Sequence, residues 1–321
     1  MKALKIQLNH ELKKIPNQKL KSIFFGGGTP SCIDAKYYTE IFEELKNFIS
    51  KDTEITTEAN PNSASKQWLE EMKEHGVNRV SFGVQSFDDK KLKFLGRNHN
   101  YTQAINAINW ANEVGYKHIN CDIIYDTALD TKELITNDLN IIKTLPIDHI
   151  SAYSLTIEEG TKFFDRTNVK IEDEDMARYI FEFLKENNFI QYEISNFSKN
   201  KEARSKHNFG YWEKDEYLGV GAGAVGCFKD TRYYPLKDVQ EYINTPLKYE
   251  KEEFLDKKDI KFEKLFLGLR SAVGVSLDIF TKSELKRINL LEKEKKINIK
   301  NNRIYNNDFM LTDEVVLFIE D

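Results

Sequence analysis

The sequence predicts an α/β fold, an incomplete parallel (β/α) barrel joined to a small winged-helix-like domain at the C-terminus. Up to about residue 156, short β-branched or aromatic runs alternate with segments of helical periodicity. Strand, helix, strand at this rhythm requires right-handed crossovers and a parallel sheet. Beyond residue 172 the alternation stops. With 321 residues, of which 40% are hydrophobic, the chain is long enough for one large and one smaller domain.

Five strands are predicted in the first part, each from a short run of β-branched and aromatic residues. Helices are expected between them, with apolar residues at spacings of three and four, as in Trp68, Leu69 and Met72. The strands are expected at residues 22–26, 54–59, 79–84, 118–125 and 149–155.

The first residues predict an amphipathic helix, because Leu4, Leu8 and Leu12 form one apolar stripe. This helix begins almost at Met1, with no strand to lead into it. A crossover helix without its strand indicates a chain that lacks its N-terminal segment.

The later part of the chain predicts a different organisation. A helix is expected at about 173–187, and the Gly- and aromatic-rich stretch 207–228 predicts a loop or close-packed backbone. A Lys/Glu-rich linker near 248–259 precedes a helix, a hairpin turning at Asn301-Asn302, and a last helix capped by Thr312. Three domains are therefore predicted: a partial barrel at 1–172, a barrel extension at 173–250 and a winged-helix-like domain at 251–321.

Composition narrows the classes of partner. The sequence has 47 basic and 52 acidic residues, a net charge of -5, so no general attraction to nucleic acid or an anionic membrane is expected. No apolar run approaches the ~20 residues of a membrane span. The three cysteines, Cys32, Cys121 and Cys227, lie far apart and form neither a disulfide framework nor a CxxC site. A reducing cytosol fits this pattern.

Three consecutive glycines, Gly26 to Gly28, follow the first predicted strand in FFGGGTPSC. Without a Cβ, such a run can turn at positive φ and present its N–H groups to a ligand. A βα loop at the carboxyl end of a strand is where α/β folds usually bind ligands. A plain tight turn is the alternative, because the spacing matches neither the dinucleotide fingerprint nor a P-loop.

Polar residues occur late in three successive predicted strands that should be apolar throughout. These are Glu58, Gln85 and Asp122, with Arg97 just after the loop of the third strand. In a β/α barrel such residues converge at the C-terminal rim, next to the glycine loop. A structural ion pair between Arg97 and Asp122 is the alternative for these two residues. Together with the glycines, the residues favour a binding site.

Glycine N–H groups, two carboxylates, an amide and an Arg suit a zwitterionic ligand that carries a ribose. The carboxylates can hold an amino group or sugar hydroxyls, and Arg or Gln can pair with a carboxylate. S-adenosylmethionine (SAM) has all of these features. A sugar phosphate is the competing ligand, although it would favour more Arg and Lys.

Five motifs, FFGGGTPS, ITTEANP, RVSFGVQSF, LGRNHN and CDIIY, resemble the radical SAM proteins related to oxygen-independent coproporphyrinogen III oxidase. The match covers nearly the whole chain. The segment HNFGYW is similar to the HNxxYW heme-binding motif of the HemW-type heme chaperones in that family. The resemblance implies SAM binding by Gly27, Gly28, Thr29, Glu58, Gln85, Arg97 and Asp122, and heme contact by His207, Asn208, Tyr211 and Trp212.

The chain departs from the family pattern in two places. Members carry a CxxxCxxC loop whose thiolates hold a 4Fe-4S cluster, whereas no cysteine precedes Cys32 here. The sequence therefore predicts that this chain cannot hold the cluster, and Cys32 and Cys121 are expected to be ordinary small residues. The Tyr-Gly-Leu-Pro that usually follows the fourth strand is replaced by Tyr125-Asp126-Thr127-Ala128.

The resemblance implies a cytoplasmic heme chaperone that binds heme or porphyrin and passes heme to an acceptor protein. The alternative, from another class, is the coproporphyrinogen III oxidase of porphyrin biosynthesis, an enzyme. A third interpretation is a truncated homologue without activity. The HNFGYW segment favours the chaperone, although a lone His207 would otherwise be an ordinary surface or core histidine.

Overall fold

The computed structural model describes residues 1–160, 163–164, 166 and 168–320. The chain divides into two compact units. Unit 1 comprises Met1–Lys21, Tyr37–Thr53 and Ser205–Asp321, and unit 2 comprises Ser22–Lys36 and Glu54–Arg204. The domain boundaries expected at residues 172 and 250 stay a prediction.

Unit 2 contains a seven-stranded sheet in the order β1-β2-β3-β4-β5-β7-β6. Strands β1 to β5 pair in parallel, and each of the five predicted strands is confirmed to within a residue at either end. The short antiparallel strands β6 and β7 extend the sheet and were not predicted. The bounds are β1 Ser22–Phe25, β2 Glu54–Ala59, β3 Arg79–Gln85, β4 His118–Tyr125, β5 His149–Ser154, β6 Ile190–Gln191 and β7 Asn196–Ser198.

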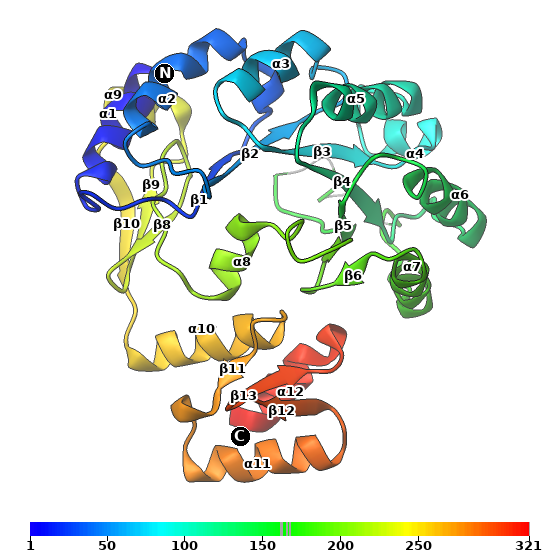
Figure 1. Cartoon of the computed structure of the whole chain (residues 1–321). Coiled ribbons are helices and arrows are strands. Elements are labelled where there is room, and N and C mark those ends of the chain that lie inside the picture. The colour runs from blue at the N-terminus through cyan, green and yellow to red at the C-terminus, as the bar shows by residue number, and fades with distance from the viewer. Residues whose placement is uncertain (161–162, 165, 167, 321) are drawn as a thin grey trace. The chain divides into compact units, whose positions relative to one another are not determined.

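Helices of unit 2 alternate with these strands and lie along the outer side of the curved sheet (Figure 1). Helix α5 begins with a capping box of Asn100 and Gln103 and ends at Gly115, whose φ of 86° is left-handed. Helix α7 begins after the cap Asp173, which confirms the helix expected at 173–187. The bounds are η1 Pro30–Cys32, α3 Lys66–Glu74, α4 Asp89–Phe94, α5 Tyr101–Val114, α6 Lys132–Ile142 and α7 Glu174–Glu186, with η2 Ala35–Tyr38 at a boundary between the units.

The two faces of β3 differ in a way that prepares a binding site. Val80, Phe82 and Val84 are fully buried, whereas Ser81 and Gly83 alternate with them and keep some exposure. Because side chains alternate along a strand, the apolar set packs into the core and the polar set points to the opposite face. The inner face of this parallel sheet is therefore polar.

Unit 1 begins with the predicted amphipathic helix, α1, in which Leu8 and Leu12 are buried. Gln7 is also buried, and its Oε1 accepts hydrogen bonds from the Gly221 N–H (2.8 Å) and the Tyr242 hydroxyl (2.7 Å). The sheet of this region has the order β10-β9-β8. The bounds are α1 Lys2–Leu12, α2 Thr39–Leu45, α8 Lys206–Trp212, β8 Gly226–Phe228, β9 Thr231–Pro235, α9 Val239–Asn244 and β10 Tyr249–Phe254.

The linker predicted near 248–259 is wrong, because this stretch forms strand β10 and the start of α10. Its charged side chains have partners on β9. Glu253 accepts from the Tyr234 hydroxyl (2.7 Å) and pairs with Arg232 (3.1 Å). A run of alternating charges that looks like a linker can thus be an edge strand whose charges are paired across the sheet.

The C-terminal part of unit 1 is winged-helix-like, with a sheet in the order β11-β13-β12. Leu265, Ile288 and Ile304 are fully buried in its core. The hairpin turns at Asn301 and Asn302 as predicted, both at positive φ. The bounds are α10 Lys257–Leu269, β11 Val275–Ser276, η3 Leu277–Ile279, α11 Lys282–Lys293, β12 Ile297–Lys300, β13 Arg303–Asn306, η4 Phe309–Leu311 and α12 Thr312–Glu320.

The expected capping role of Thr312 is not what the structure shows. Thr312 is already the first residue of α12. Its hydroxyl donates to the Phe309 carbonyl (2.8 Å) and accepts from the Asn306 amide (3.0 Å). The hydroxyl therefore joins the helix to the preceding turn and strand. Among the residues described, each helix is either too short or too polar to cross a bilayer.

Candidate functional site

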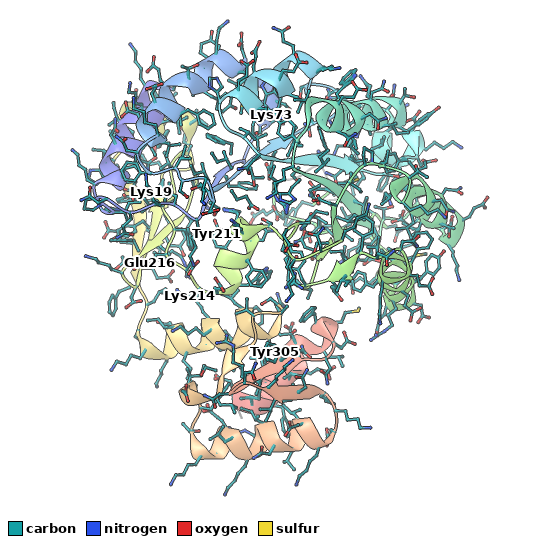
Figure 2. All side chains as sticks on the ribbon, in the orientation of Figure 1. Lys19, Lys73, Tyr211, Lys214, Glu216 and Tyr305 are labelled. Carbon is teal, nitrogen blue, oxygen red and sulfur yellow. The ribbon has the colours of Figure 1, made fainter. Side chains whose placement is uncertain are left out.

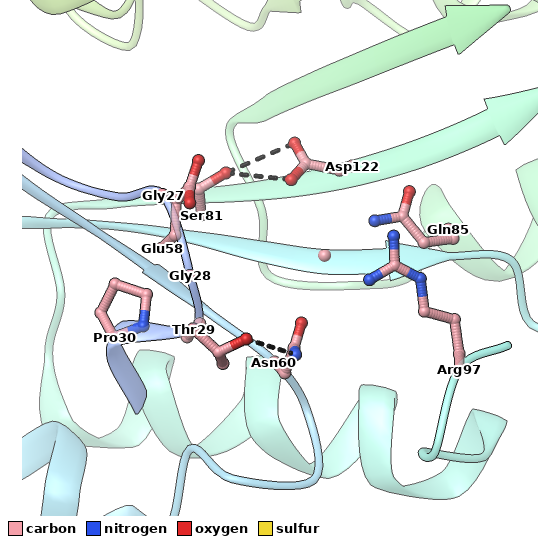
Figure 3. Close-up of a pocket in the computed structure, with 12 residues that line it drawn as sticks. Gly27, Gly28, Thr29, Pro30, Glu58, Asn60, Ser81, Gln85, Arg97 and Asp122 are labelled. Atoms are coloured by element: carbon pink, nitrogen blue, oxygen red, sulfur yellow. Dashed lines mark hydrogen bonds between the residues drawn. The ribbon is translucent and has the colours of Figure 1, made fainter. Parts of the chain in front are cut away.

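A polar cavity of about 220 Å³ opens on the inner face of the unit 2 sheet (Figure 3). Its walls come from the loop after β1, from the end of β2, from β3 and β4, and from the loop after α4. The lining residues are Gly27, Gly28, Thr29, Pro30, Glu58, Ala59, Asn60, Ser81, Gly83, Gln85, Arg97 and Asp122.

The glycine loop forms one wall of the cavity. Gly27 has a φ of 99°, a left-handed conformation that disfavours any side chain. Its N–H donates to the Glu58 carboxylate. A Cβ at Gly26 would come within 3.1 Å of Glu58 Cδ, so the glycine also makes room for that carboxylate.

Hydrogen bonds after the glycines hold the loop in place. The Ser31 hydroxyl lies 2.6 Å from that of Ser63 and accepts from the Asn60 N–H (3.0 Å). The Asn60 amide donates to Thr29 Oγ1 (3.1 Å). The Trp68 indole N–H donates to the backbone carbonyl just after η1 (2.9 Å). The loop is therefore tied to the segment after β2 and to α3.

Glu58 and Asp122 place two carboxyl groups in one cavity. Burial, followed by repulsion from Asp122, raises the pKa of Glu58 to about 7, although the Gly27 N–H opposes the shift. Burial raises the pKa of Asp122 to about 6, against hydrogen bonds from Ser151, Asn120 and Ser81 and the positive charge of Arg97. At neutral pH the cavity therefore holds carboxylate charge together with the positive charge of Arg97, an arrangement that suits a zwitterionic ligand.

Gln85 and Arg97 approach the cavity from its other side (Figure 3). Gln85 is 7% exposed and has a φ of 70°, at an irregularity in the β3–β4 pairing. This strained conformation turns the last side chain of β3. Burial lowers the pKa of Arg97, and Asp122 opposes the shift. No direct ion pair joins Arg97 to Asp122 within the described part of the chain, so Arg97 keeps donors for a ligand.

The cavity thus brings together all seven residues that the motifs predicted for SAM: Gly27, Gly28, Thr29, Glu58, Gln85, Arg97 and Asp122. The sequence did not single out the other lining residues, which are Pro30, Ala59, Asn60, Ser81 and Gly83. The signal for two of them was present, since Ser81 and Gly83 alternate with the buried residues of β3. A Cβ at Gly83 would lie 3.1 Å from the Gln85 amide nitrogen and 3.3 Å from Asn60 Oδ1.

The departure at Tyr125-Asp126 has a simple conformational explanation. Asp126 adopts a φ of 63°, the region where the family usually has Gly. Asp tolerates this region better than most residues. Its carboxylate accepts from the Ser154 hydroxyl (2.6 Å), which fixes the turn after β4. The backbone that leads away from Asp122 therefore keeps a glycine-like turn.

The four residues of the heme-type motif lie on helix α8. This helix begins after Ser205, and the Ser205 side chain accepts a hydrogen bond from the Asn208 N–H (3.2 Å). Residues four apart share a helix face, so His207 lies with Tyr211 and Asn208 with Trp212. The rings of His207 and Tyr211 meet edge to face at 4.8 Å. Tyr211 is 40% exposed (Figure 2).

Tyr211 continues this aromatic contact beyond the helix, because its ring lies 4.7 Å from that of Tyr217. Tyr217 forms an antiparallel bridge with Cys227. A Cβ at Gly219 would collide with the backbone of Ala224 and Val225. The close-packed glycine backbone predicted for this stretch is thus confirmed at Gly219, but the loop predicted for 207–228 is wrong at its two ends, which form α8 and β8.

Ion pairs connect the end of α8 to other elements of unit 1. Lys214, just beyond the helix, pairs with Glu263 of α10 at 2.9 Å. Glu263 also pairs with Arg232 of β9. The indole nitrogen of Trp212 is buried and has no hydrogen-bond partner among the described residues. The helix therefore presents aromatic rings on a segment held by ion pairs.

Comparisons with known proteins agree with this geometry. Residues 5–135 match the Radical SAM superfamily. The chain is 34% identical over 284 residues to the heme chaperone HemW of Lactococcus lactis, covering 85% of this chain and 75% of that protein. The HemW of Bacillus subtilis is 31% identical over 292 residues, with coverage of 86% and 76%. The chain belongs to the HemW family.

A solved structure shows the same fold as this HemW-family chain. It is coproporphyrinogen III oxidase (HemN) from Escherichia coli, described as a radical SAM enzyme. The TM-score is 0.81, with 99% of this chain and 82% of the other covered at 18% identity. At that identity the likeness concerns the fold alone. The α/β architecture with a parallel sheet is thus confirmed.

The three cysteines of this HemW-family chain are not grouped as the ligands of one iron–sulfur cluster would be. Such clusters are held by neighbouring Cys thiolates. Cys32 is exposed at the end of η1, Cys121 is fully buried within β4, and Cys227 is buried in unit 1. Across the described residues, no group of three His, Cys, Asp or Glu side chains could hold a metal ion.

Proposed function

We propose that this chain is a heme chaperone that binds SAM in the unit 2 cavity, binds heme at α8 and passes heme to an acceptor protein. The observation that carries the proposal is the convergence of Glu58, Gln85, Arg97 and Asp122 with the glycine loop, in a chain of the HemW family. The described residues match a zwitterion with a ribose better than a sugar phosphate, because two carboxylates face a single Arg.

The amino-acid and ribose parts of SAM have suitable groups in the cavity. The carboxylates of Glu58 and Asp122 are acceptors for an ammonium group or ribose hydroxyls, and Arg97 and Gln85 can donate to a carboxylate. The open space around Gly28 allows close approach to its backbone. When bound, SAM would supply an activated sulfonium.

For heme, His207 supplies an imidazole, a side chain of the kind that ligates heme iron. Tyr211, which contacts the His207 ring, offers an aromatic surface against which a macrocycle can pack. Transfer to an acceptor requires that the heme remain accessible, and the exposure of Tyr211 agrees with this. The likeness to the oxidase concerns the fold, so the chaperone function is taken from the HemW relatives.

Calorimetric titration with SAM tests the cavity. We expect Glu58→Gln and Asp122→Asn each to weaken binding by roughly tenfold, because a desolvated ion pair is lost. Glu133→Gln, which changes an exposed carboxylate on α6, is the matched control and should bind as wild type does. Equal affinity in all four proteins, or no binding to wild type, would contradict the proposed cofactor site.

Absorbance titration with hemin tests α8. His207→Ala should weaken binding by roughly tenfold and change the Soret band, because an axial ligand is lost. His10→Ala, which removes an exposed histidine of α1, is the control for a nonspecific imidazole contribution. If His207→Ala and His10→Ala titrate alike, heme binds elsewhere.

A further inference from the structure

A buried chain of polar side chains runs from Asp122 away from the cavity. The Asn120 amide nitrogen lies 2.6 Å from Asp122 Oδ1, and Asn120 Oδ1 lies 2.6 Å from His149 Nδ1. His149 Nε2 lies 2.6 Å from the Tyr192 hydroxyl. Asn120, His149 and Tyr192 are 4%, 2% and 0% exposed. These hydrogen-bonded side chains come from β4, β5 and the segment between β6 and β7.

The direction of these hydrogen bonds follows from the chemistry of the atoms. An amide oxygen only accepts, so His149 Nδ1 must donate to Asn120. Burial, with the nearby charge of Arg79 and His118, lowers the pKa of His149, so the ring is neutral and Nε2 is an acceptor. Tyr192 therefore donates to His149, which donates to Asn120, which donates to Asp122.

We propose that His149, held by Tyr192, is a positioning residue that fixes the Asn120 amide with its NH₂ toward Asp122 and so keeps that carboxylate ionised and aimed into the cavity. This inference rests on the proposed SAM site for its functional meaning. The alternative amide orientation would place an oxygen 2.6 Å from the carboxylate, and the two acceptors would repel.

The remaining groups around Asp122 show why the orientation of one amide matters. Ser151 of β5 donates to Asp122, and so does Ser81 of β3, whose hydroxyl is 3.3 Å from both carboxylate oxygens. Glu58 of β2 and Tyr153 of β5 each interact unfavourably with the Asp122 charge, whereas Arg97 favours it. The Asn120 amide nitrogen, at 2.6 Å, lies nearer to the carboxylate than the Ser81 hydroxyl does.

A matched pair of variants separates the donor from the bulk of His149. In His149→Asn, the Nδ2 group occupies nearly the place of the imidazole Nδ1 and can still donate to Asn120. His149→Leu has almost the same size but no donor, so the Asn120 amide keeps only the hydroxyls of Ser81 and Ser151, which can donate or accept and therefore fix neither orientation. Both variants leave a similar cavity, so a difference between them reports on the hydrogen bond.

The first measurement follows the Asp122 carboxyl carbon by ¹³C NMR in ligand-free protein labelled at Asp, with Asp122→Asn used for assignment. We expect His149→Leu to move the titration midpoint up by about one pH unit, because a hydrogen bond to the ionised form is lost. His149→Asn should stay near wild type. The same midpoint in both variants overturns the proposal.

A second pair of variants tests the same proposal if either His149 variant fails to fold. Tyr192→Phe removes the hydroxyl behind His149 and should shift the Asp122 midpoint upward by roughly a few tenths of a pH unit. Tyr116→Phe removes another buried hydroxyl of unit 2, one that donates to the Leu69 carbonyl at 2.9 Å, and should not shift it. Equal shifts would mean a general effect of destabilisation and overturn the proposal.

Titration with SAM then tests whether the hydrogen bonds from His149 through Asn120 to Asp122 affect ligand binding. Affinity should rise with pH as Asp122 ionises, and His149→Leu should move that rise upward while His149→Asn does not. If wild type binds no SAM but the NMR midpoints differ as expected, the proposed cofactor site is wrong and the positioning role of His149 is supported. If SAM binds and the midpoints of the two His149 variants coincide, only the positioning role of His149 is wrong.

Discussion

The cavity of unit 2 and helix α8 of unit 1 are built in opposite ways. The cavity draws its polar groups from separate segments between Gly27 and Asp122, and its carboxylates have raised pKa values. Helix α8 carries its four candidate residues within the single stretch 207–212. The first site exists only once the sheet has formed, whereas the second is a local motif.

This difference decides what each region can be expected to do. A site enclosed by a sheet and a strained loop fixes donors and acceptors before a ligand arrives, which favours selective binding of a polar molecule. A short helix with an exposed Tyr211 offers only one face to a ligand, an arrangement from which a ligand would be released more easily. Retention suits a cofactor, and release suits a cargo.

The largest expected effect concerns the support of α8. In Gly219→Ala, the new methyl group would collide with the backbone of Ala224 and Val225, which cannot move as a side chain can. We expect the free energy of unfolding to fall by roughly 2–3 kcal/mol, the range for overpacking. Thermal unfolding measures this. Gly223→Ala, with only Lys237 Cγ nearby at 3.9 Å but a φ of 70°, should cost less.

If Gly219→Ala leaves stability unchanged, the segment after α8 is not close-packed. The contrast between a rigid cavity and a helix fastened by a glycine turn and ion pairs would then need revision. If instead heme binding is lost while SAM binding persists, the two regions are independent in function as well as in construction.

The second prediction concerns the pH dependence of stability, which should distinguish the two regions. The folded-state pKa of Glu58 is about 7 and that of Asp122 about 6, both above the usual values of 4.5 and 3.8. Between about pH 4 and 7 these two carboxyl groups therefore bind more protons in the folded protein than in the unfolded chain, so the stability that they contribute falls as pH rises. The lowered pKa of His149 acts in the opposite direction, so the contribution of one carboxyl group is measured as the difference between wild type and a variant, from the unfolding temperatures of ligand-free protein at about pH 5 and about pH 7.5.

Glu58→Gln should remove roughly 1–2 kcal/mol of that fall, a figure reduced for the partial exposure of the group. Glu213→Gln, which changes an exposed carboxylate at the end of α8, is the control and should give a curve parallel to wild type. A Glu58→Gln curve that also runs parallel to wild type would show that this carboxyl is not desolvated.

Much of this arrangement follows from the sequence by simple rules. The five parallel strands were predictable because their buried faces are continuous β-branched and aromatic runs, and Glu58, Gln85 and Asp122 because each interrupts such a run near its end. The left-handed turn at Gly27 follows from a glycine run after a strand. These signals lie within short stretches of the sequence, so they can be recognised without the structure.

Other features depend on partners distant in sequence and gave no local signal. Strand β10 looked like a linker because its charges are neutralised by residues of β9, such as Arg232. His149 and Tyr192 looked like ordinary residues of a strand and a loop, since their hydrogen bonds to Asn120 and to each other span 29 and 43 positions. Thr312 resembled a cap because only the fold shows that its hydroxyl bonds to nearby groups of the turn and strand before it.

The smallest expected effect separates conformation from space within the glycine loop itself. A Cβ added at Gly27 or at Gly28 would meet no atom within 4 Å, but only Gly27 has a left-handed φ, of 99°. Gly27→Ala should therefore lower the free energy of unfolding by about 1 kcal/mol through backbone strain, and Gly28→Ala should leave it unchanged. Thermal unfolding of ligand-free protein compares the two. Equal stability would mean that the loop relaxes freely, and the cavity would then be no more preorganised than α8.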